Sequence, residues 1–340
     1  MFSFRTKVGI DLGTANTLVY VQKQGIVLNE PTVVAYSAED RQVLAVGEDA
    51  REMIGRTPQS IVASRPMKEG VIADFKTTSA MITYYLRKAL KGRVLWPEVM
   101  ISIPGGSSQV EKRAVVAASK QAGASDVYLI EEPLAAAIGA KIPISQPSGH
   151  MIVNIGGGTA EIGILSLGQL VVFKTVRTAG TKIDEAILTH IRKKHNLYIG
   201  ERTAEEIKMR MGNAHMVQDG EGKKILPRSI EVKGRDTQSG LPRIAEIGEE
   251  SINEALQKPL KQIIEGVKEV LSLSPPELAA DIIEKGIVLS GGTAMLKNLD
   301  KYITYYTGVP TFVVEEPLFC VIRGIGSAIE NLDTYKKAIR

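Results

Sequence analysis

The chain has 340 residues, of which 44% are hydrophobic and 24% are charged, so it is neither disordered nor fibrous, and its length favours two globular domains. Its 42 basic and 38 acidic residues give a net charge of +4, which is too balanced to indicate nucleic acid as a partner. Cys320 is the only cysteine, so a disulfide framework is excluded and a reducing compartment fits.

The first part of the chain predicts strands followed by a helix. Strands are expected over about residues 7–11, 17–22 and 25–37, and shorter ones between 43 and 70 around a helix near 48–54. Pro31 indicates a bend or a sheet edge within the third strand. An amphipathic helix is predicted over about residues 77–89.

The rest of the chain alternates strands with helices. The predicted order is a strand over 98–104, a helix over 110–122, a strand over 127–130, and helices over about 182–194, 203–212 and 252–271. The last region has a strand over 285–289, a turn over 290–293, a helix, a strand over 311–314 and a closing helix from about Gly324. This alternation is typical of α/β folds.

Two segments, residues 8–20 and 151–164, repeat one design. Each is an apolar strand that carries Asp11 or Asn154, then a Gly/Thr hairpin and a second strand. Glycine lets backbone N–H groups converge on phosphate oxygens, because no Cβ intervenes and positive φ is cheap. Either segment alone is equally compatible with an ordinary hairpin. Together they predict that two hairpins hold one polyphosphate, as in a nucleotide site.

Asp11 lies beside the first hairpin. Because a carboxylate and a phosphate repel each other, we expect an Mg²⁺ ion with its waters between them. The sequence therefore predicts Asp11 as an outer-sphere metal residue.

Several longer motifs resemble one known family. They are residues 10–17, 25–31, 65–74, 130–139, 199–205 and 275–278, and the likeness to the MreB family of bacterial actins covers nearly the whole chain. The resemblance implies the α/β actin-like ATPase fold, in which two duplicated RNase-H-like domains flank a nucleotide cleft and each carries an accessory subdomain. We expect the halves at residues 1–145 and 146–340, with accessory subdomains within about 32–75 and 182–250.

The resemblance also implies a function. Members bind ATP or ADP with Mg²⁺, polymerise into paired, antiparallel protofilaments, and help to determine rod shape by organising cell-wall synthesis. The implied partners are further copies of the chain, the anionic inner membrane surface, and membrane proteins of cell shape and wall synthesis. No apolar run reaches membrane-spanning length. We therefore expect a cytoplasmic protein that is peripheral on the inner face of the plasma membrane.

Roles for single residues follow from the resemblance. The first phosphate loop corresponds to Gly13, Thr14, Ala15, Asn16 and Thr17, the second to Gly156, Gly157, Gly158 and Thr159, and the adenosine loop to Gly291, Gly292 and Thr293. Glu132 matches the carboxylate that orients the attacking water, although read alone it is an acid favoured at a helix start. Glu205 and Lys208 fall where relatives touch ribose and adenine, although read alone they form a solvent-facing ion pair.

The chain departs from the family pattern at Asn154, where relatives have aspartate. The catalytic candidates are Glu132, Thr159 and Asn154. The amide of Asn154 keeps the shape of aspartate but loses its charge, so we predict that it holds metal-bound water only weakly and that hydrolysis is slow. Thr293 replaces a glycine, and residues 179–181 replace Gly-Gly-Asp. One alternative is a copolymerising actin that does not hydrolyse ATP. A small-molecule kinase of the same fold is less favoured, because no residue set marks a substrate pocket.

Two surface sites are also predicted. Val94, Leu95 and Trp96 correspond to the loop that inserts into the membrane in relatives, with Phe2 and Phe4 as a second anchor, although a buried loop anchor is the alternative. The helix face carrying Val110, Arg113, Val116 and Ser119 is a candidate surface for pairing protofilaments through Val110. Single apolar surface residues are common, which is the ordinary explanation.

Overall fold

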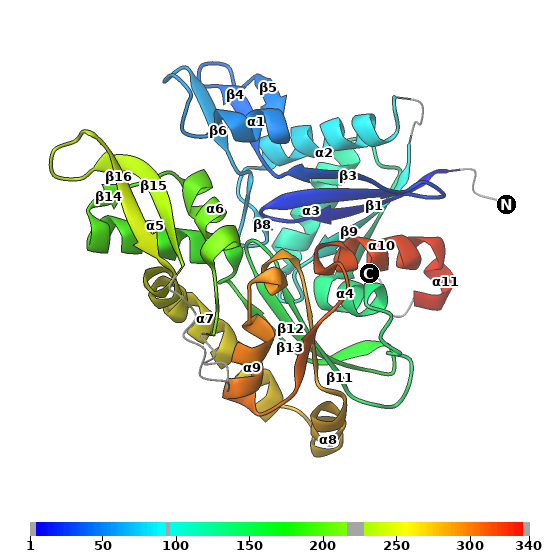
Figure 1. Ribbon diagram of the computed structural model, residues 1–340. Helices are drawn as coiled ribbons and strands as arrows, with labels where there is room; N and C mark the ends of the chain where they lie inside the picture. The colour runs from blue at the N-terminus through cyan, green and yellow to red at the C-terminus, as the bar shows by residue number, and fades with distance from the viewer. Residues whose placement is uncertain (1–4, 93–95, 216–227, 336–340) are drawn as a thin grey trace.

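The computed structural model describes residues 5–92, 96–215 and 228–335. Two five-stranded sheets organise these residues, and they lie in different halves of the molecule (Figure 1). The first contains β1 (Lys7–Leu12), β2 (Asn16–Val21), β3 (Gly25–Pro31), β9 (Glu98–Ile103) and β10 (Asp126–Glu131). The second contains β11 (His150–Ile155), β12 (Ala160–Ser166), β13 (Gln169–Val176), β17 (Ile287–Ser290) and β18 (Thr311–Val313).

The two sheets have the same topology. Their orders are β10-β9-β1-β2-β3 and β18-β17-β11-β12-β13, with two parallel pairings followed by two antiparallel ones in each. The central strands β1 and β11 are therefore equivalent, and the hairpins that follow them leave from equivalent sheet positions. The repeated sequence design is matched by a repeated strand arrangement.

Helices cover both sheets. They are α2 (Phe75–Ala89) and α3 (Gln109–Gln121) in the first half, and α5 (Gly180–His195), α7 (Glu249–Ser272), α8 (Pro276–Lys285) and α9 (Leu299–Thr307) in the second. Ser108 caps the start of α3 with a capping box, because its side chain accepts from the Glu111 amide while the Glu111 carboxylate accepts from the Ser108 amide. The core of the first half includes Met81, Tyr85 and Val115 from these helices.

The chain end returns to the first half. The helix α10 (Cys320–Glu330), followed by α11 (Leu332–Tyr335), lies against α4 (Glu132–Gly139) and against β1 (Figure 1). A Cβ on Gly324 would be 1.7 Å from the Ala135 carbonyl oxygen, and one on Gly139 would be 1.8 Å from the Cys320 carbonyl oxygen. The two backbones cross so closely that only glycine fits at these points. The domain boundary expected near residue 145 stays a prediction.

Each half carries a smaller sheet at the top of the molecule as drawn in Figure 1. The first accessory part consists of β4 (Val34–Ser37), β5 (Val43–Val46), β6 (Ile61–Ser64) and α1 (Glu48–Met53). The second accessory part consists of β14 (Leu197–Tyr198), β15 (Ser229–Asp236), β16 (Pro242–Gly248) and α6 (Glu201–Met211). The remaining elements are the hairpin β7 (Met67–Lys68) and β8 (Val71–Ile72) and the short helices η1 (Gly292–Met295) and η2 (Pro317–Phe319).

Some predicted element bounds were wrong. The strand expected over 25–37 divides after Pro31, because β3 belongs to the large sheet while β4 belongs to the accessory sheet. Lys285 ends α8, so the strand expected over 285–289 begins at Ile287. The closing helix begins at Cys320, four positions before the predicted Gly324. No helix in the described part of the chain is both long and apolar enough to span a membrane.

Candidate functional site

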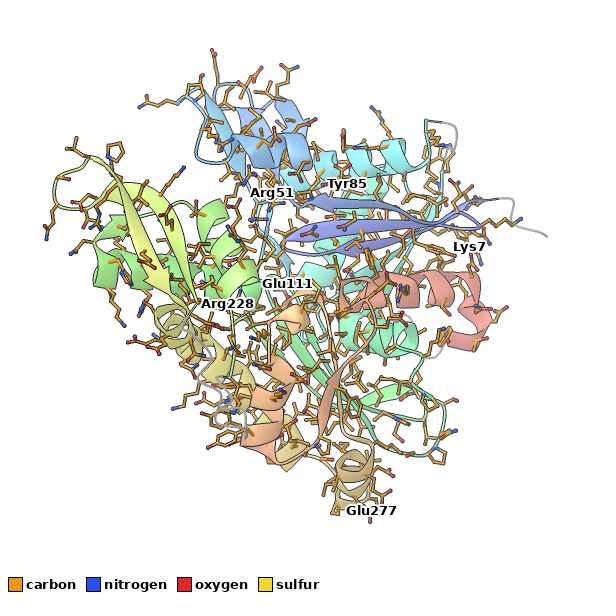
Figure 2. All side chains as sticks on the ribbon, viewed as in Figure 1. Lys7, Arg51, Tyr85, Glu111, Arg228 and Glu277 are labelled. Atoms are coloured by element: carbon orange, nitrogen blue, oxygen red, sulfur yellow. The ribbon has the colours of Figure 1, made fainter. Side chains whose placement is uncertain are left out.

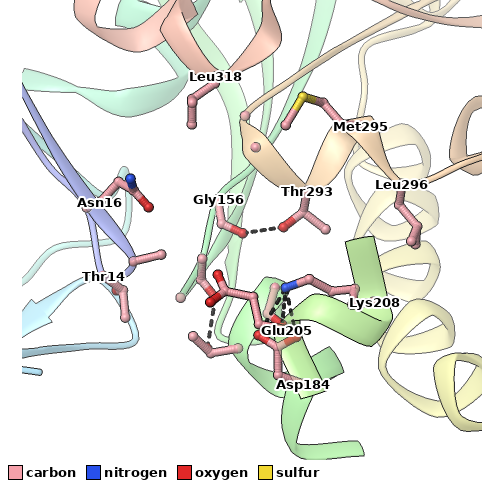
Figure 3. A pocket seen from close by; sticks show the side chains of 18 of the residues that line it. Thr14, Asn16, Gly156, Asp184, Glu205, Lys208, Thr293, Met295, Leu296 and Leu318 are labelled. Atoms are coloured by element: carbon pink, nitrogen blue, oxygen red, sulfur yellow. Dashed lines mark hydrogen bonds and ion pairs between the residues drawn. The ribbon is translucent and has the colours of Figure 1, made fainter. Parts of the chain in front are cut away.

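A cavity of about 680 Å³ lies between the two halves (Figure 3). Of the predicted nucleotide and catalytic residues, those that line it are Asp11, Gly13, Thr14, Ala15, Asn16, Glu132, Asn154, Gly156, Gly157, Gly158, Thr159, Glu205, Lys208, Gly291, Gly292 and Thr293. Further lining residues that sequence reasoning missed include Arg51, Arg65, Asp184, Arg228 and Leu318. Both hairpins and both accessory parts therefore contribute to one cavity.

The first loop is held from behind by two threonines. Thr32 Oγ1 donates to the Gly13 carbonyl oxygen at 2.7 Å, and the hydroxyls of Thr17 and Thr32 are 2.9 Å apart. Thr17 is only 1% exposed and does not line the cavity. Its hydroxyl supports the loop backbone in this structure, and a direct contact with phosphate stays a prediction.

The second loop is held by two threonine hydroxyls from other elements. Thr293 Oγ1 donates to the Gly156 carbonyl oxygen at 2.7 Å, and Thr181 Oγ1 donates to the Gly157 carbonyl oxygen at 2.8 Å. The first of these bonds is visible in Figure 3. Both hydroxyls donate to carbonyl oxygens of the loop, so neither of them occupies a loop N–H group. The two threonines therefore stabilise the backbone of the second loop.

The two loops approach each other closely. A Cβ on Gly157 would come within 2.5 Å of the Ala15 Cβ, and one on Gly158 within 2.2 Å of Thr14 Oγ1. Thr14 Oγ1 also accepts from the Gly70 amide at 3.0 Å. Among the predicted glycines, positive φ occurs only at Gly291, with φ 86°, so the argument from cheap positive φ was wrong for both phosphate loops. Close approach is the reason for glycine there.

Two acidic side chains form the floor of the cavity. Ser102 Oγ donates to Asp11 Oδ1 at 2.8 Å, and burial raises the pKa of Asp11 to about 6. Burial, followed by the charges of Glu161 and Asp11, raises the pKa of Glu132 well above its usual value. Both buried carboxyl groups therefore lie in surroundings that disfavour their ionised forms.

Asn154 uses both ends of its amide. Its Nδ2 donates to Glu132 Oε2 at 3.2 Å, while its Oδ1 accepts from Ser290 Oγ at 3.0 Å. The side chain is 3% exposed. An aspartate here would present a second carboxylate to Glu132, so the amide relieves a repulsion that the ligand-free floor otherwise contains.

Glu161 is a buried acid that sequence reasoning missed. It is 0% exposed and stands opposite Asn154 in the β11–β12 pairing. Its Oε2 accepts from the Gly105 amide at 3.0 Å and from Thr175 Oγ1 at 2.7 Å, while burial raises its pKa to about 7. The signal in the sequence was a single acid in an otherwise apolar strand. Glu161 thus links the second sheet to the loop that follows β9.

Lys208 and Glu205 do not pair with each other, so the solvent-facing ion pair was wrong. Lys208 Nζ lies 2.9 Å from Asp184 Oδ1 and donates to the Gly180 carbonyl oxygen at 3.2 Å (Figure 3). Burial raises the pKa of Asp184 to about 6, although Lys208 opposes the shift. Glu205 pairs instead with Arg51 from the first accessory part, with Oε2 and Nη2 3.0 Å apart.

The acidic floor fits an Mg²⁺ ion in its chemistry. Oxygen ligands are what Mg²⁺ prefers, and Asp11 and Glu132 supply carboxylate oxygens whose mutual repulsion a cation would offset. No group of three or more metal-ligating His, Cys, Asp or Glu side chains occurs among the residues that the structure describes. Water and phosphate oxygens would therefore have to complete the coordination, as is usual for this ion.

The predicted surface sites are described only in part. Val94, Leu95, Phe2 and Phe4 lie outside the described residues. Trp96 is 64% exposed, and Val110 is 75% exposed at the start of α3. Ser119 is fully buried and donates to the Val115 carbonyl oxygen, so including it in an exposed helix face was wrong.

Comparisons with known proteins give matches over the whole chain. The family model described as MreB/Mbl protein matches residues 5–337. The cell shape-determining protein MreB of Escherichia coli strain K12 is 46% identical over 338 residues, covering 98% of this chain and 95% of that protein. The crystal structure of MreB5 of Spiroplasma citri bound to ADP matches with TM-score 0.91 and 35% identity, covering 98% of this chain and 99% of the other.

Two further structures are similar. MreB5 of Spiroplasma citri bound to AMPPNP matches with TM-score 0.90, 35% identity and coverage of 98% of this chain and 99% of the other. The MamK double helical filament matches with TM-score 0.80 over 96% of this chain and 99% of the other, but at 22% identity it shows the shared fold alone.

Proposed function

Because the chain belongs to the MreB/Mbl family and has the actin-like fold, we propose that it is a filament-forming bacterial actin that binds ATP and ADP and helps to determine rod cell shape by organising cell-wall synthesis. The observation that carries this proposal is the close approach of Gly157 and Gly158 to the first loop across a shared cavity. A relative that is named for determining cell shape supports it, as do the structures of MreB5 bound to ADP and to AMPPNP.

The cavity suits a nucleotide in size and in polarity. A volume of about 680 Å³ is in the usual range for small-molecule sites. Loop N–H groups at residues 13–16 and 157–159 would bind the phosphates, while Glu205, Lys208 and the loop at 291–293 would bind the nucleoside. The Gly156 amide already donates to the Thr159 carbonyl oxygen at 2.9 Å, so Gly156 would contribute through its backbone position. Glycine at the loop tips lets the backbone approach the ligand without steric hindrance.

Hydrolysis would rest on Glu132. Its carboxylate would orient the attacking water and accept its proton, Thr159 would assist through its hydroxyl, and Asn154 would fix Glu132 through the 3.2 Å hydrogen bond. Asp11 would hold Mg²⁺ through water, with Asn154 as a weak second contact, and the ion would neutralise charge on the phosphates. Because the neutral amide of Asn154 would hold metal-bound water less strongly than a carboxylate, we expect slow turnover.

A copolymerising actin that barely hydrolyses ATP is the second candidate. The neutral Asn154 favours it, because an amide that is fully engaged with Glu132 and Ser290 holds metal-bound water less strongly than a carboxylate. A small-molecule kinase has no comparable observation in its favour.

Phosphate release and filament pelleting, measured together, separate these candidates. With ATP and Mg²⁺, slow release with pelleting supports the enzyme, while pelleting with no release supports the inert polymer. AMPPNP should support pelleting in both cases. Glu132→Gln should reduce release at least about 100-fold without weakening nucleotide binding. If wild-type protein binds no adenine nucleotide, the proposed function is wrong.

We further propose that the chain lies on the inner face of the plasma membrane, where membrane proteins of cell shape and wall synthesis would be its partners. The exposed Trp96 supports a membrane loop shared with Val94 and Leu95, because an indole is favoured at the headgroup interface. Trp96→Ser should reduce sedimentation with anionic liposomes by at least about half. Unchanged sedimentation after serine replaces all three residues would exclude this loop.

Protofilament pairing through Val110 is also part of the proposal. Its side chain is 75% exposed, so it is accessible to a second copy of the chain. Val110→Glu should leave nucleotide binding unchanged and convert paired filaments into single ones under the electron microscope. Paired filaments in this variant would assign the contact to another surface.

A further inference from the structure

The two accessory parts meet at the mouth of the cavity through an ion pair. Arg51 on α1 and Glu205 on α6 are 3.0 Å apart between Nη2 and Oε2, although they are 154 positions apart in the chain. Figure 2 places Arg51 on the side of the first accessory part that faces the second. Both side chains line the cavity. The pair therefore bridges the two halves where a ligand would enter or leave.

The pair is more shielded from solvent than an ordinary surface ion pair. Arg51 is 27% exposed and Glu205 is 24% exposed, so both groups are partly shielded from solvent. Glu48, in the first turn of α1, places a second carboxylate oxygen 3.8 Å from Arg51 Nη1. The guanidinium is thus held between an acid of its own helix and an acid of the opposite half, and its planar fork suits two such contacts.

A second ion pair crosses between the halves. Lys182, near the start of α5, lies 3.7 Å from Glu69 in the turn between β7 and β8. Lys182 is also 2.9 Å from Glu185 in the next turn of its own helix. This contact is longer than the Arg51–Glu205 contact and both its side chains are more exposed, at 34% and 30%. The stronger constraint on the mouth therefore comes from Arg51.

Glu205 has two possible tasks. In the proposed function its carboxylate accepts hydrogen bonds from ribose hydroxyls, and in this structure Oε2 accepts from Arg51. A carboxylate has two oxygens and can accept both kinds of bond, so Arg51 fixes the orientation in which the remaining oxygen is offered to the ligand. Moving α1 away from α6 breaks the ion pair and removes that orientation in the same step.

We propose that Arg51 is a positioning residue for nucleotide binding: it orients Glu205 toward the ribose and closes the mouth, so that the Arg51–Glu205 pair must open before nucleotide leaves. This inference rests on the proposed nucleotide binding. It adds a coupling between the two accessory parts that controls the residence time of the ligand. We expect the effect mainly in the release rate, because affinity differences among variants of one binding site lie mostly in dissociation.

Release of a fluorescent ADP analogue, mant-ADP, from full-length protein in a stopped-flow instrument tests the proposal. Arg51→Ala should accelerate release about twofold to fivefold, which is the range for an ion pair that is only partly shielded. Arg51→Lys, which keeps the charge but not the fork, should fall between that variant and wild type. Arg202→Ala is the matched control, because it breaks an ion pair with Glu206 on the same helix at 48% and 51% exposure.

Salt provides a readout that a merely structural role would not move. Release from wild type should accelerate between low and high potassium chloride because salt screens the pair, and release from Arg51→Ala should respond less. Equal release rates for Arg51→Ala and Arg202→Ala, with mant-ADP still bound, would overturn the role of Arg51 alone. Absence of mant-ADP binding to wild type would instead overturn the proposed function on which it rests.

Discussion

Asp11 and Asn154 occupy equivalent places in the two halves, yet their surroundings differ. Each is the fifth residue of the central strand of its sheet, and each precedes a glycine hairpin. Asp11 faces Leu18 on the neighbouring strand, whereas Asn154 faces the buried Glu161. The first half exposes its acid to the cavity, and the second half places a neutral amide there and an acid behind it. The same backbone position therefore holds an acidic side chain in the first half and a neutral one in the second.

The largest expected effect comes from separating the two loops. In Gly158→Val the new side chain would collide with Thr14 Oγ1, which is only 2.2 Å from an ideal Cβ, and with the backbone of Glu69 at 3.1 Å. Calorimetry should find ADP affinity reduced at least about 100-fold, because the loops can no longer bind the same phosphates. Gly248→Ala is the control, since a Cβ there meets nothing within 4 Å. Unchanged affinity in Gly158→Val would show that the loops act separately.

Asn154→Asp makes the two halves alike. With Mg²⁺ we expect phosphate release to rise about tenfold, because a carboxylate orients metal-bound water more strongly than an amide. Without Mg²⁺ the variant should unfold more easily, by about 1–2 kcal/mol, because Glu132 loses the Asn154 donor and faces a second carboxylate. A release rate equal to that of wild type would exclude Asn154 as the cause of slow turnover.

Glu161→Gln tests the acid behind the amide. The pKa of Glu161 is raised from 4.5 to about 7, so its contribution to stability is complete below about pH 4.5 and is lost as the pH rises through 7. Glutamine keeps an acceptor for Gly105 and Thr175 but does not ionise. The variant should be within about 1 kcal/mol of wild type at pH 5 and should exceed it at pH 8 by about 2–3 kcal/mol of unfolding free energy.

Denaturant unfolding at the two pH values measures that difference. The charges of Glu132 and Arg177 act on Glu161, so the variants are compared at one ionic strength. Glu277→Gln is the control at an exposed position on α8. A Glu161→Gln variant that is less stable than wild type at pH 8 would mean that the buried carboxylate is charged and favourably paired.

The smallest effect is expected from removing a threonine hydroxyl that stabilises the second loop. Thr293→Ala removes the 2.7 Å hydrogen bond to the Gly156 carbonyl oxygen, which is worth about 1 kcal/mol. ADP affinity should fall about threefold to fivefold in an equilibrium titration. Thr334→Ala, on α11 and outside the cavity lining, is the control. An increase in affinity would show that Thr293 obstructs the adenosine loop.

Local sequence was sufficient for the parts of the site that lie next to each other in the chain. The two hairpins, the acid at Asp11 and the helix start at Glu132 follow from glycine, strand and turn patterns, and the structure brings them to one cavity. The Arg51–Glu205 pair joins segments that are 154 positions apart, so no local sequence pattern predicts it. The hydrogen bonds of Thr181 and Thr293 could not be predicted from local sequence either, because their acceptors are far away in the chain.

The sequence predicted a role for the second loop but not the contacts that explain its glycines. Glycine at positions 156–158 was interpreted as a sign of phosphate binding. In the structure, glycine is required at 157 and 158 because the opposite loop lies so close, and this contact depends on how the halves pack. The division of the strand expected over 25–37 likewise depends on where the accessory sheet attaches. Sequence patterns specify elements, whereas contacts between halves are fixed by tertiary packing.

Hydrogen exchange of full-length protein with and without ADP and Mg²⁺ tests the central claim most directly. If both loops hold one polyphosphate, amides at residues 12–17 and at 155–160 should slow together and half-saturate at the same ADP concentration. Protection of one loop alone, or of neither while ADP is bound, would contradict the account.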